Sequence, residues 1–273
     1  MSSNTASWRC PNCDGACELD YCPSCGQSRR DWDISLGTWL RTNGREILDI
    51  DGRLFGSLRT LFTRPGQLTL DWLQGRHASR TRPLRLYLLA SALFFGVLAL
   101  PVTDFGTDAV EGAIDGFADA GEPGDSPRLA ALADDEAGLT RVAEAVSNNM
   151  PRAMFLLLPL VAVLVGLAGW VIRSPSHHYV AHLVWALHIH SVTFLVLLAW
   201  FPLNYLRGSA KFSITYPIVG LSILWLAWYW VKAFSRAYEC SMTKALMSLA
   251  AVGVFYTPVL ILVVVAISAL SLR

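Results

Sequence analysis

The most regular feature of the sequence is a series of long uncharged runs, rich in apolar residues and separated by shorter polar segments. Five such runs follow residue 83. Each is close to the roughly 20 residues that an α-helix needs to cross the hydrocarbon of a bilayer. They predict membrane spans at about residues 84–102, 153–172, 179–201, 212–231 and 245–271. The expected fold class is therefore an all-α membrane protein with about five transmembrane helices, which occupy residues 83–273.

The segment ahead of the first run has a different, helical periodicity. Apolar residues recur there on one face of a helix, at Leu54, Phe55, Leu58, Leu61 and Phe62. Asp51 is placed to cap the start of this helix, and Pro65-Gly66 to end it. A basic amphipathic helix before a span is typical of a helix that lies in the membrane interface, and packing on the N-terminal cysteine module is the alternative. Residues 31–82 are thus interpreted as a juxtamembrane amphipathic region.

Composition supports a membrane protein, and the charges are strongly segregated. The chain is 53% hydrophobic and 16% charged, with a mean hydropathy of +0.42, which is too apolar for an ordinary soluble domain. Its net charge of +1 hides two blocks. Residues 29–85 hold eleven arginines against six acids, whereas residues 103–152 hold eleven acids against three arginines. The first block suits the anionic cytoplasmic leaflet, and the acidic loop 103–151 suits the opposite side.

A basic collar directly before the first span sets the expected orientation. Positive flanks resist translocation, so this end is expected in the cytoplasm with its arginines at the membrane surface. The collar consists of Arg76, Arg80, Arg82 and Arg85. Residues 1–9 lack an apolar signal core, and the N-terminus is expected to be retained. Acids spaced three or four apart in residues 104–122 predict a solvated helical stripe, with cation binding as the alternative.

Residues 8–28 contain two Cys-x-x-Cys pairs, each with a proline directly after its first cysteine. The four cysteines are Cys10, Cys13, Cys22 and Cys25. Two such pairs fold as two turns that present four thiolates to one tetrahedral ion, and zinc is the usual occupant because it accepts four sulfurs without redox chemistry. Two disulfides or free thiols are the alternative, which fits a reducing compartment poorly. Residues 1–30 are therefore predicted to form a small cytosolic zinc ribbon.

A site closed by four sulfurs leaves no position for water, so the zinc is expected to be structural. Cys17 lies between the pairs and is interpreted as a spare buried thiol, with ligand exchange as the alternative. Ribbons often bind nucleic acid or protein. Arg9, Arg29 and Arg30 are better explained as charges that face lipid. We therefore expect a protein partner at the ribbon and no nucleic acid.

A dense set of titratable groups lies around the third predicted span, at His178, His182, His188 and His190. On a helix, His178 and His182 are about 40° apart, a spacing that can hold one metal ion, whereas His188 and His190 are about 200° apart. The latter pair is expected roughly 15 Å deep, near the middle of the bilayer. One hypothesis is a second metal site or a haem or quinone site. The alternative is neutral imidazoles that hydrogen-bond between helices.

Several short motifs follow one another in order: C-x-x-C, C-P-x-C-G-Q, D-x-D-G-R-L, T-L-F-T-R-P-G, G-R and a proline-led span. With the His-rich third span they resemble a bacterial membrane family catalogued as domain of unknown function 3667, and the likeness runs from Cys10 to Phe201. The resemblance implies a zinc ribbon joined to a helical membrane domain, and it supplies no activity. The family often has Glu before the His of an E-H-L-V-F-like motif. Here Ala181 precedes His182, which argues against an acid role.

Apart from Arg85 at the start of the first one, the predicted spans contain no Asp, Glu, Lys or Arg, which argues against an ion-coupled transporter and an intramembrane hydrolase. The leading hypothesis is a non-enzymatic protein of the bacterial inner membrane with a cytoplasmic N-terminus. Its ribbon docks a protein partner, and its membrane domain anchors, assembles or regulates another component of the bilayer. A homo-oligomer of the chain is one form that this protein can take. The second hypothesis is a His-dependent enzyme or carrier that handles a metal, haem or quinone. The third is a small-solute permease.

Overall fold

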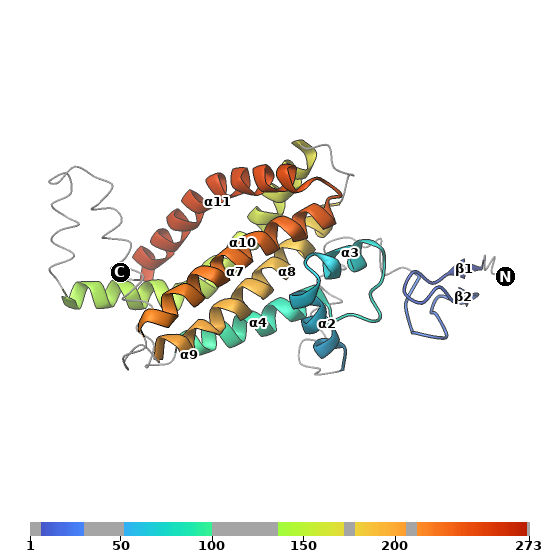
Figure 1. Cartoon of the computed structure of the whole chain (residues 1–273), viewed down its shortest axis with the longest axis horizontal. Coiled ribbons are helices and arrows are strands. Elements are labelled where there is room, and N and C mark those ends of the chain that lie inside the picture. The colour runs from blue at the N-terminus through green and yellow to red at the C-terminus, as the bar shows by residue number, and fades with distance from the viewer. Residues whose placement is uncertain (1–6, 30–51, 100–135, 172–177, 206–211, 272–273) are drawn as a thin grey trace.

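The computed structural model describes residues 7–29, 52–99, 136–171, 178–205 and 212–271 (Figure 1). The chain starts with a small ribbon in which β1 (Trp8–Arg9) pairs antiparallel with β2 (Ala16–Cys17). Within the described residues, all further elements are helices: α2 (Gly52–Thr63), α3 (Gln67–Leu73), α4 (Pro83–Leu98), α7 (Glu136–Val171), α8 (Tyr179–Leu198), α9 (Trp200–Tyr205), α10 (Phe212–Ala237) and α11 (Met242–Ser271). The expected all-α membrane fold behind an N-terminal cysteine module is confirmed.

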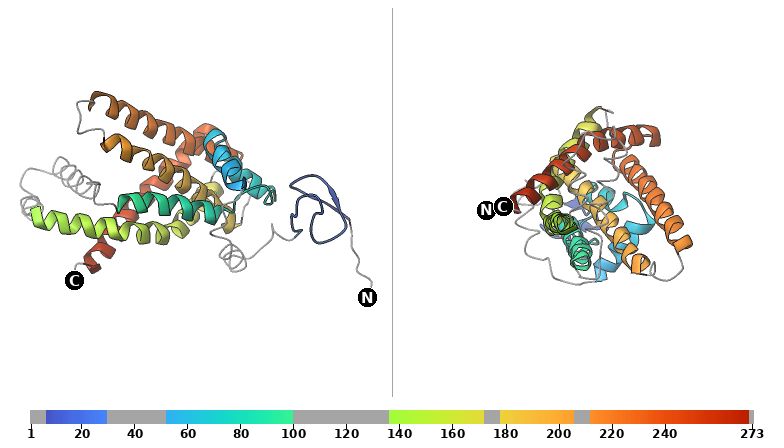
Figure 2. Two further views of the ribbon diagram at one scale, coloured as in Figure 1. Left: turned by 90° about the horizontal axis from the view of Figure 1, so that it is seen from below. Right: turned by 90° about the vertical axis from the view of Figure 1, so that its left-hand side faces the viewer.

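The long helices alternate in direction along the bundle (Figure 1). α4, α8 and α11 begin at the end where the ribbon lies, and α7 and α10 finish there. Figure 2 shows α2 and α3 at this same end, between the ribbon and the bundle. Such alternation is what a chain that crosses a bilayer five times requires.

Four described helices are long and apolar enough to span a membrane, over Asn148–Trp170, Tyr179–Pro202, Pro217–Ala237 and Met242–Ala266. α4 has 16 residues and is therefore about 24 Å long, shorter than the roughly 30 Å of bilayer hydrocarbon. The predicted span 84–102 continues beyond the last described residue of this segment. A fifth span therefore stays a prediction.

Three helices extend beyond the bounds that the charges indicated. α7 already starts at Glu136, inside the predicted loop 103–151. α10 continues past Lys232 to Ala237, and α11 starts ahead of Lys244. The expectation of spans without charged residues is wrong, because the candidate span Pro217–Ala237 includes Lys232 and Arg236. Long cationic side chains can reach polar groups at a helix end, so the helix need not stop where the charge appears. Asp51 and the acidic stripe 104–122 lie outside the described residues.

α8 lies at the centre of the bundle, in contact with α3, α4, α7 and α10. Most of its first four turns is buried. Aromatic rings join it to α4: Phe94 stacks on Phe194 with ring centroids 5.3 Å apart, and Tyr87 meets His190 edge-on at 6.4 Å. α4 thus starts beside the middle of α8 rather than beside its first turn. The first turn of α4 is consequently enclosed by other parts of the protein.

The predicted amphipathic helix exists as α2, and most of its apolar face packs into the helical bundle. Leu61 is 2% exposed and belongs to the main core, whereas Phe55 is 70% exposed. Tyr229 Oη donates a hydrogen bond to the carbonyl of Leu61 at 2.7 Å, and Arg236 Nη1 donates to the carbonyl of Pro65 at 2.6 Å. Leu61 therefore packs in the core of the bundle and not on the cysteine module, which was the alternative. Placement in the membrane interface stays a prediction for the exposed side of this helix.

Gly66 joins α2 to α3 at a point where only glycine fits. Its φ is +75°, and a Cβ added there would lie 2.7 Å from the carbonyl oxygen of Ala233 and 2.9 Å from its Cα. Gly66→Ala is therefore expected to destabilise the protein by about 2 kcal/mol or more, through left-handed strain and backbone overlap. Thermal unfolding of the purified protein in detergent measures this loss. Gly56→Ala is the control: it meets no atom within 4 Å, lies within α2, and is expected to be neutral or stabilising.

Candidate metal centre

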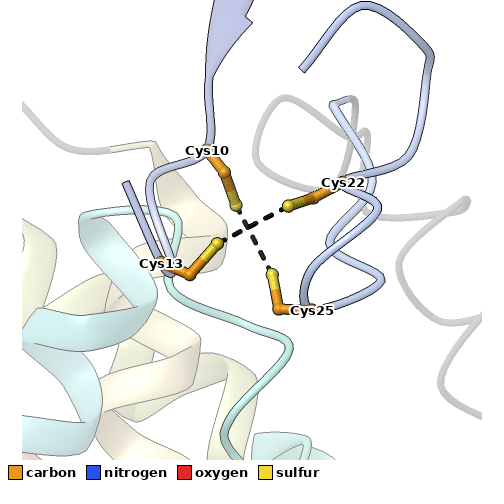
Figure 3. A group of neighbouring side chains, drawn as sticks. All are labelled: Cys10, Cys13, Cys22 and Cys25. Atoms are coloured by element: carbon orange, nitrogen blue, oxygen red, sulfur yellow. Dashed lines mark hydrogen bonds between the residues drawn. The ribbon is translucent and has the colours of Figure 1, made fainter. Parts of the chain in front are cut away.

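The four predicted ligands converge on one point (Figure 3). The Sγ atoms of Cys10, Cys13, Cys22 and Cys25 all lie within 4.8 Å of one another. Cys10 and Cys25 are 3.5 Å apart, as are Cys13 and Cys22. A tetrahedral ion with metal–sulfur bonds of about 2.3 Å needs sulfurs about 3.8 Å apart. The four side chains therefore fit a single metal ion, and all are free thiols rather than disulfides.

Two similar turns bring these sulfurs together. In the first, the N–H of Asp14 donates to the carbonyl of Cys10, and in the second, the N–H of Gly26 donates to the carbonyl of Cys22. Asp14 and Gly26 occupy the same place in their turns, and both have a positive φ, 64° and 72°. Gly26 adopts this conformation at no steric cost. The matching role of Asp14 was missed, although aspartate tolerates this conformation better than most residues.

The pKa values of the ribbon thiols differ, and they do not separate the four converging cysteines from Cys17, because burial also raises the pKa of Cys10, and hydrogen bonds with Cys22 and Cys25 outweigh one from the backbone of Gly15 and raise that of Cys13. Burial acts to raise the pKa of Cys22, but hydrogen bonds from the backbone of Ser24 and Cys25 outweigh it and lower that pKa to about 6. Burial and a hydrogen bond with Cys22 raise the pKa of Cys17 to about 11. Cys17 is 1% exposed, and its thiol donates to the carbonyl of Gly15 at 3.5 Å. It is a buried thiol outside the group of four, as expected.

The ribbon contacts the segment between α3 and α4 through residues next to the cysteines. Gln27, only 1% exposed, accepts hydrogen bonds through Oε1 from the N–H groups of His77 and Ala78, at 3.1 and 2.8 Å. The hydroxyl of Ser79 donates to Oδ1 of Asn12 at 2.9 Å. Sequence reasoning missed this contact, because an amide side chain in a turn carries no signal of a partner 50 residues away. The ribbon that carries the four-sulfur centre is therefore linked to the juxtamembrane segment.

The collar arginines occupy different environments. Asp71 is buried, and both Nε and Nη2 of Arg80 lie 2.8 Å from its Oδ2. Nη1 of Arg76 is 3.8 Å from Oδ1 of the same carboxylate. Arg82 is the N-cap residue of α4, and Arg85, in its first turn, is buried. Binding of the collar to lipid stays a prediction, but Arg80 is held within the protein by an acid that the sequence did not single out.

The histidines of α8 take separate partners. Nδ1 of His182 shares a hydrogen bond of 2.6 Å with the hydroxyl of Tyr238, and the two rings stack. Nδ1 of His188 lies 2.9 Å from the hydroxyl of Thr69, and His190 contacts the carbonyl of Ala186 at 2.8 Å. His178 is exposed at the N-cap of α8. Within the described ranges, groups of three or more metal-ligating side chains include the four cysteines and none of these histidines.

A family model matches residues 51–95, and its description is Protein of unknown function (DUF3667). The matched segment contains α2, α3 and most of α4, together with Gly66, Asp71, Arg80 and Arg85. It confirms the resemblance for this part of the chain and does not reach the cysteines or the His-rich helix. Comparisons with curated proteins and with solved structures gave no match.

Proposed function

We propose that this chain, whose residues 51–95 carry the DUF3667 segment, is a non-enzymatic protein of a bacterial inner membrane in which a zinc ribbon docks a protein partner. The observation that carries the proposal is a closed four-sulfur centre in a module that is linked by Gln27 to that segment. Four helices of spanning length support the membrane part of the proposal. The membrane domain then anchors the ribbon and transmits or receives the effect of docking.

Zinc is the proposed ion because four thiolates suit it and because it needs no open coordination position. All four ligands come from one short segment, and Cys10 and Cys22 are almost fully buried. The ribbon has a small apolar core of its own, made of cysteines and Trp8 and separate from the core of the bundle. So small a core does not hold a fold by hydrophobic burial alone, and metal binding supplies the missing free energy. The metal role is therefore structural.

Two large side chains of the ribbon provide the surface for docking. Leu19 is 72% exposed and Tyr21 is 65% exposed, and both lie between the two cysteine pairs. The indole of Trp8 donates to the carbonyl of Leu19 at 2.8 Å, which fixes the backbone there. Exposed aliphatic and aromatic side chains on a rigid turn are the anchors that protein interfaces use. We assign the protein partner to this surface.

The cytosolic position of the ribbon rests on charge. Lys232, Arg236 and Lys244 lie near the C-terminus of α10 and the N-terminus of α11, and these two helix ends lie at the ribbon side of the bundle (Figure 1). Arg76 and Arg80 are linked to the same side through α3. An excess of basic residues marks the cytoplasmic side of a membrane protein. The ribbon is thus assigned to the cytoplasm.

The docking proposal is tested by crosslinking in cells of the source bacterium. A photoreactive amino acid at position 19 or 21 is expected to give one defined adduct whose partner is identified by mass spectrometry. The same probe at Glu18, an exposed neighbour, is the matched control. Leu19→Ser with Tyr21→Ser is expected to reduce recovery of that partner at least tenfold while zinc content stays at one ion per chain. Equal adducts from positions 18, 19 and 21, or full recovery with the double variant, would contradict the proposal.

A further inference from the structure

The first turn of α4 holds an arginine without a counter-charge in the described part of the chain. Arg85 is 6% exposed. Its Nε and Nη2 atoms are buried and have no hydrogen-bond partner. Arg80, by comparison, is paired with Asp71. A buried unpaired guanidinium is far more costly than a paired one, and an ionisable side chain left so within a membrane protein is a candidate for function. Arg85 is therefore a candidate for binding an anion.

The identity of the two unbonded nitrogens indicates which kind of anion fits. Nε–H and one N–H of Nη2 point in parallel from the same edge of the guanidinium plane. This edge is the fork that binds two oxygens of one carboxylate or phosphate. A chloride ion or a single carbonyl oxygen would have to accept from both N–H groups at one point, which gives each hydrogen bond a poorer angle. The unbonded pair of Arg85 thus matches one oxyanion.

Further donors lie at the same place. The N-cap of α4, Arg82, makes no side-chain capping hydrogen bond, and Pro83 follows it in the first turn. The N–H groups of Leu84 and Arg85 have no partner inside the helix, and the helix dipole is positive there. One turn earlier, Thr81 is 5% exposed and its hydroxyl has no partner. Helical side chains lean toward the N-terminus, so the guanidinium of Arg85 lies over this turn.

We propose that Arg85, Thr81 and the first turn of α4 form a binding site for a phosphate group, carried by a membrane lipid or free in solution. Phosphate presents the oxygens that the fork and the helix N-terminus both bind. Arg85 keeps a small exposed fraction, and rotation about its side-chain bonds can turn the buried fork toward an arriving anion. The site is separate from the metal centre and does not depend on the docking function.

The test uses the full-length, metal-loaded protein in neutral detergent and measures its apparent unfolding temperature. The probes are inorganic phosphate and phosphatidylglycerol, with chloride at equal ionic strength and diacylglycerol as the respective controls. Phosphate bound at a hundredfold excess over Kd is expected to raise the unfolding temperature by about 5 °C. A rise with both probes indicates a free phosphate site, and a rise with phosphatidylglycerol alone indicates a lipid headgroup. No rise above the controls with either probe would overturn the proposal.

Variants assign the effect to the site. Arg85→Met is expected to fold, because it removes an uncompensated buried charge, and to lose the temperature rise completely. Arg59→Gln removes an exposed arginine of α2 and is expected to keep the full rise. Thr81→Val, which keeps the side-chain shape, is expected to weaken phosphate binding about threefold to tenfold. A full rise in Arg85→Met overturns the proposal. Should that variant fail to fold, unchanged binding by Thr81→Val overturns it instead.

Discussion

Replacing Cys22 by serine is expected to remove the metal and unfold the ribbon while the helical bundle stays folded. Cys22 is 2% exposed and lies 3.5 Å from Cys13 across the centre. A hydroxyl does not replace a thiolate ligand, and structural zinc contributes roughly 10 kcal/mol or more to the folding of such a module. Because the ribbon and the bundle have separate cores, the loss is expected to stay local. Elemental analysis and limited proteolysis of residues 7–29 measure both effects.

Cys17→Ser is the matched control for this variant. It changes a buried thiol of the same module that lies outside the four-sulfur group. It is expected to keep about one zinc ion per chain and to lose little more than the packing of one sulfur. Wild-type protein that carries no metal and has its cysteines joined in disulfides would contradict the assignment. So would zinc that stays bound in Cys22→Ser.

Replacing Arg80 by methionine is expected to destabilise the membrane domain by about 3 kcal/mol. The side chain of Asp71 is 3% exposed, and Arg80 contacts its Oδ2 through two nitrogens at 2.8 Å. Methionine keeps much of the apolar stem but leaves the carboxylate without its main counter-charge. Gln67 still donates to Oδ1 at 2.8 Å, which limits the loss. Unfolding of the purified protein in mixed detergent micelles measures the change in free energy.

Arg76→Met provides the comparison, since it removes the second arginine near the same carboxylate. Its guanidinium is 3.8 Å from Asp71 and its side chain is 49% exposed, so the expected cost is below about 1 kcal/mol. The double variant Asp71→Leu with Arg80→Met removes both charges and is expected to be more stable than Arg80→Met alone. Equal losses for Arg76→Met and Arg80→Met would show that the buried ion pair is not the source of stability.

Local patterns in the sequence were enough to find the long apolar helices and the four cysteines that converge in the ribbon. The spacing of Cys10, Cys13, Cys22 and Cys25 carries its own geometry, because each pair and its turn are formed within a few residues. The length of each apolar run likewise indicates which helices can lie in lipid. Charge was a poorer guide to helix ends. Lys232 and Lys244 are included in α10 and α11, since a cationic side chain at the end of a span reaches polar surroundings without a break in the helix.

Roles that join distant parts of the chain could not be read in the same way. Asp71 had no special signal, yet it binds Arg80 inside the protein. Gln27 belongs to a cysteine motif, yet its amide binds the backbone of His77 and Ala78. His178 and His182 have a spacing that suits a metal ion, but Nδ1 of His182 is bonded to the hydroxyl of Tyr238. Likewise, Nδ1 of His188 is bonded to the hydroxyl of Thr69. Each of these contacts depends on which helices pack together.

The sequence by itself determined that this protein has apolar helices long enough for a membrane, a four-cysteine module ahead of them, and a basic segment between the two. These features follow from spacing and hydropathy, which act over one or two turns of chain. Only the tertiary structure decided that the basic segment is built into the bundle, that Arg80 is paired and that Arg85 is not. Electrostatic pairing is settled by distances of a few ångströms between residues from different elements, and these distances exist only once the helices have packed.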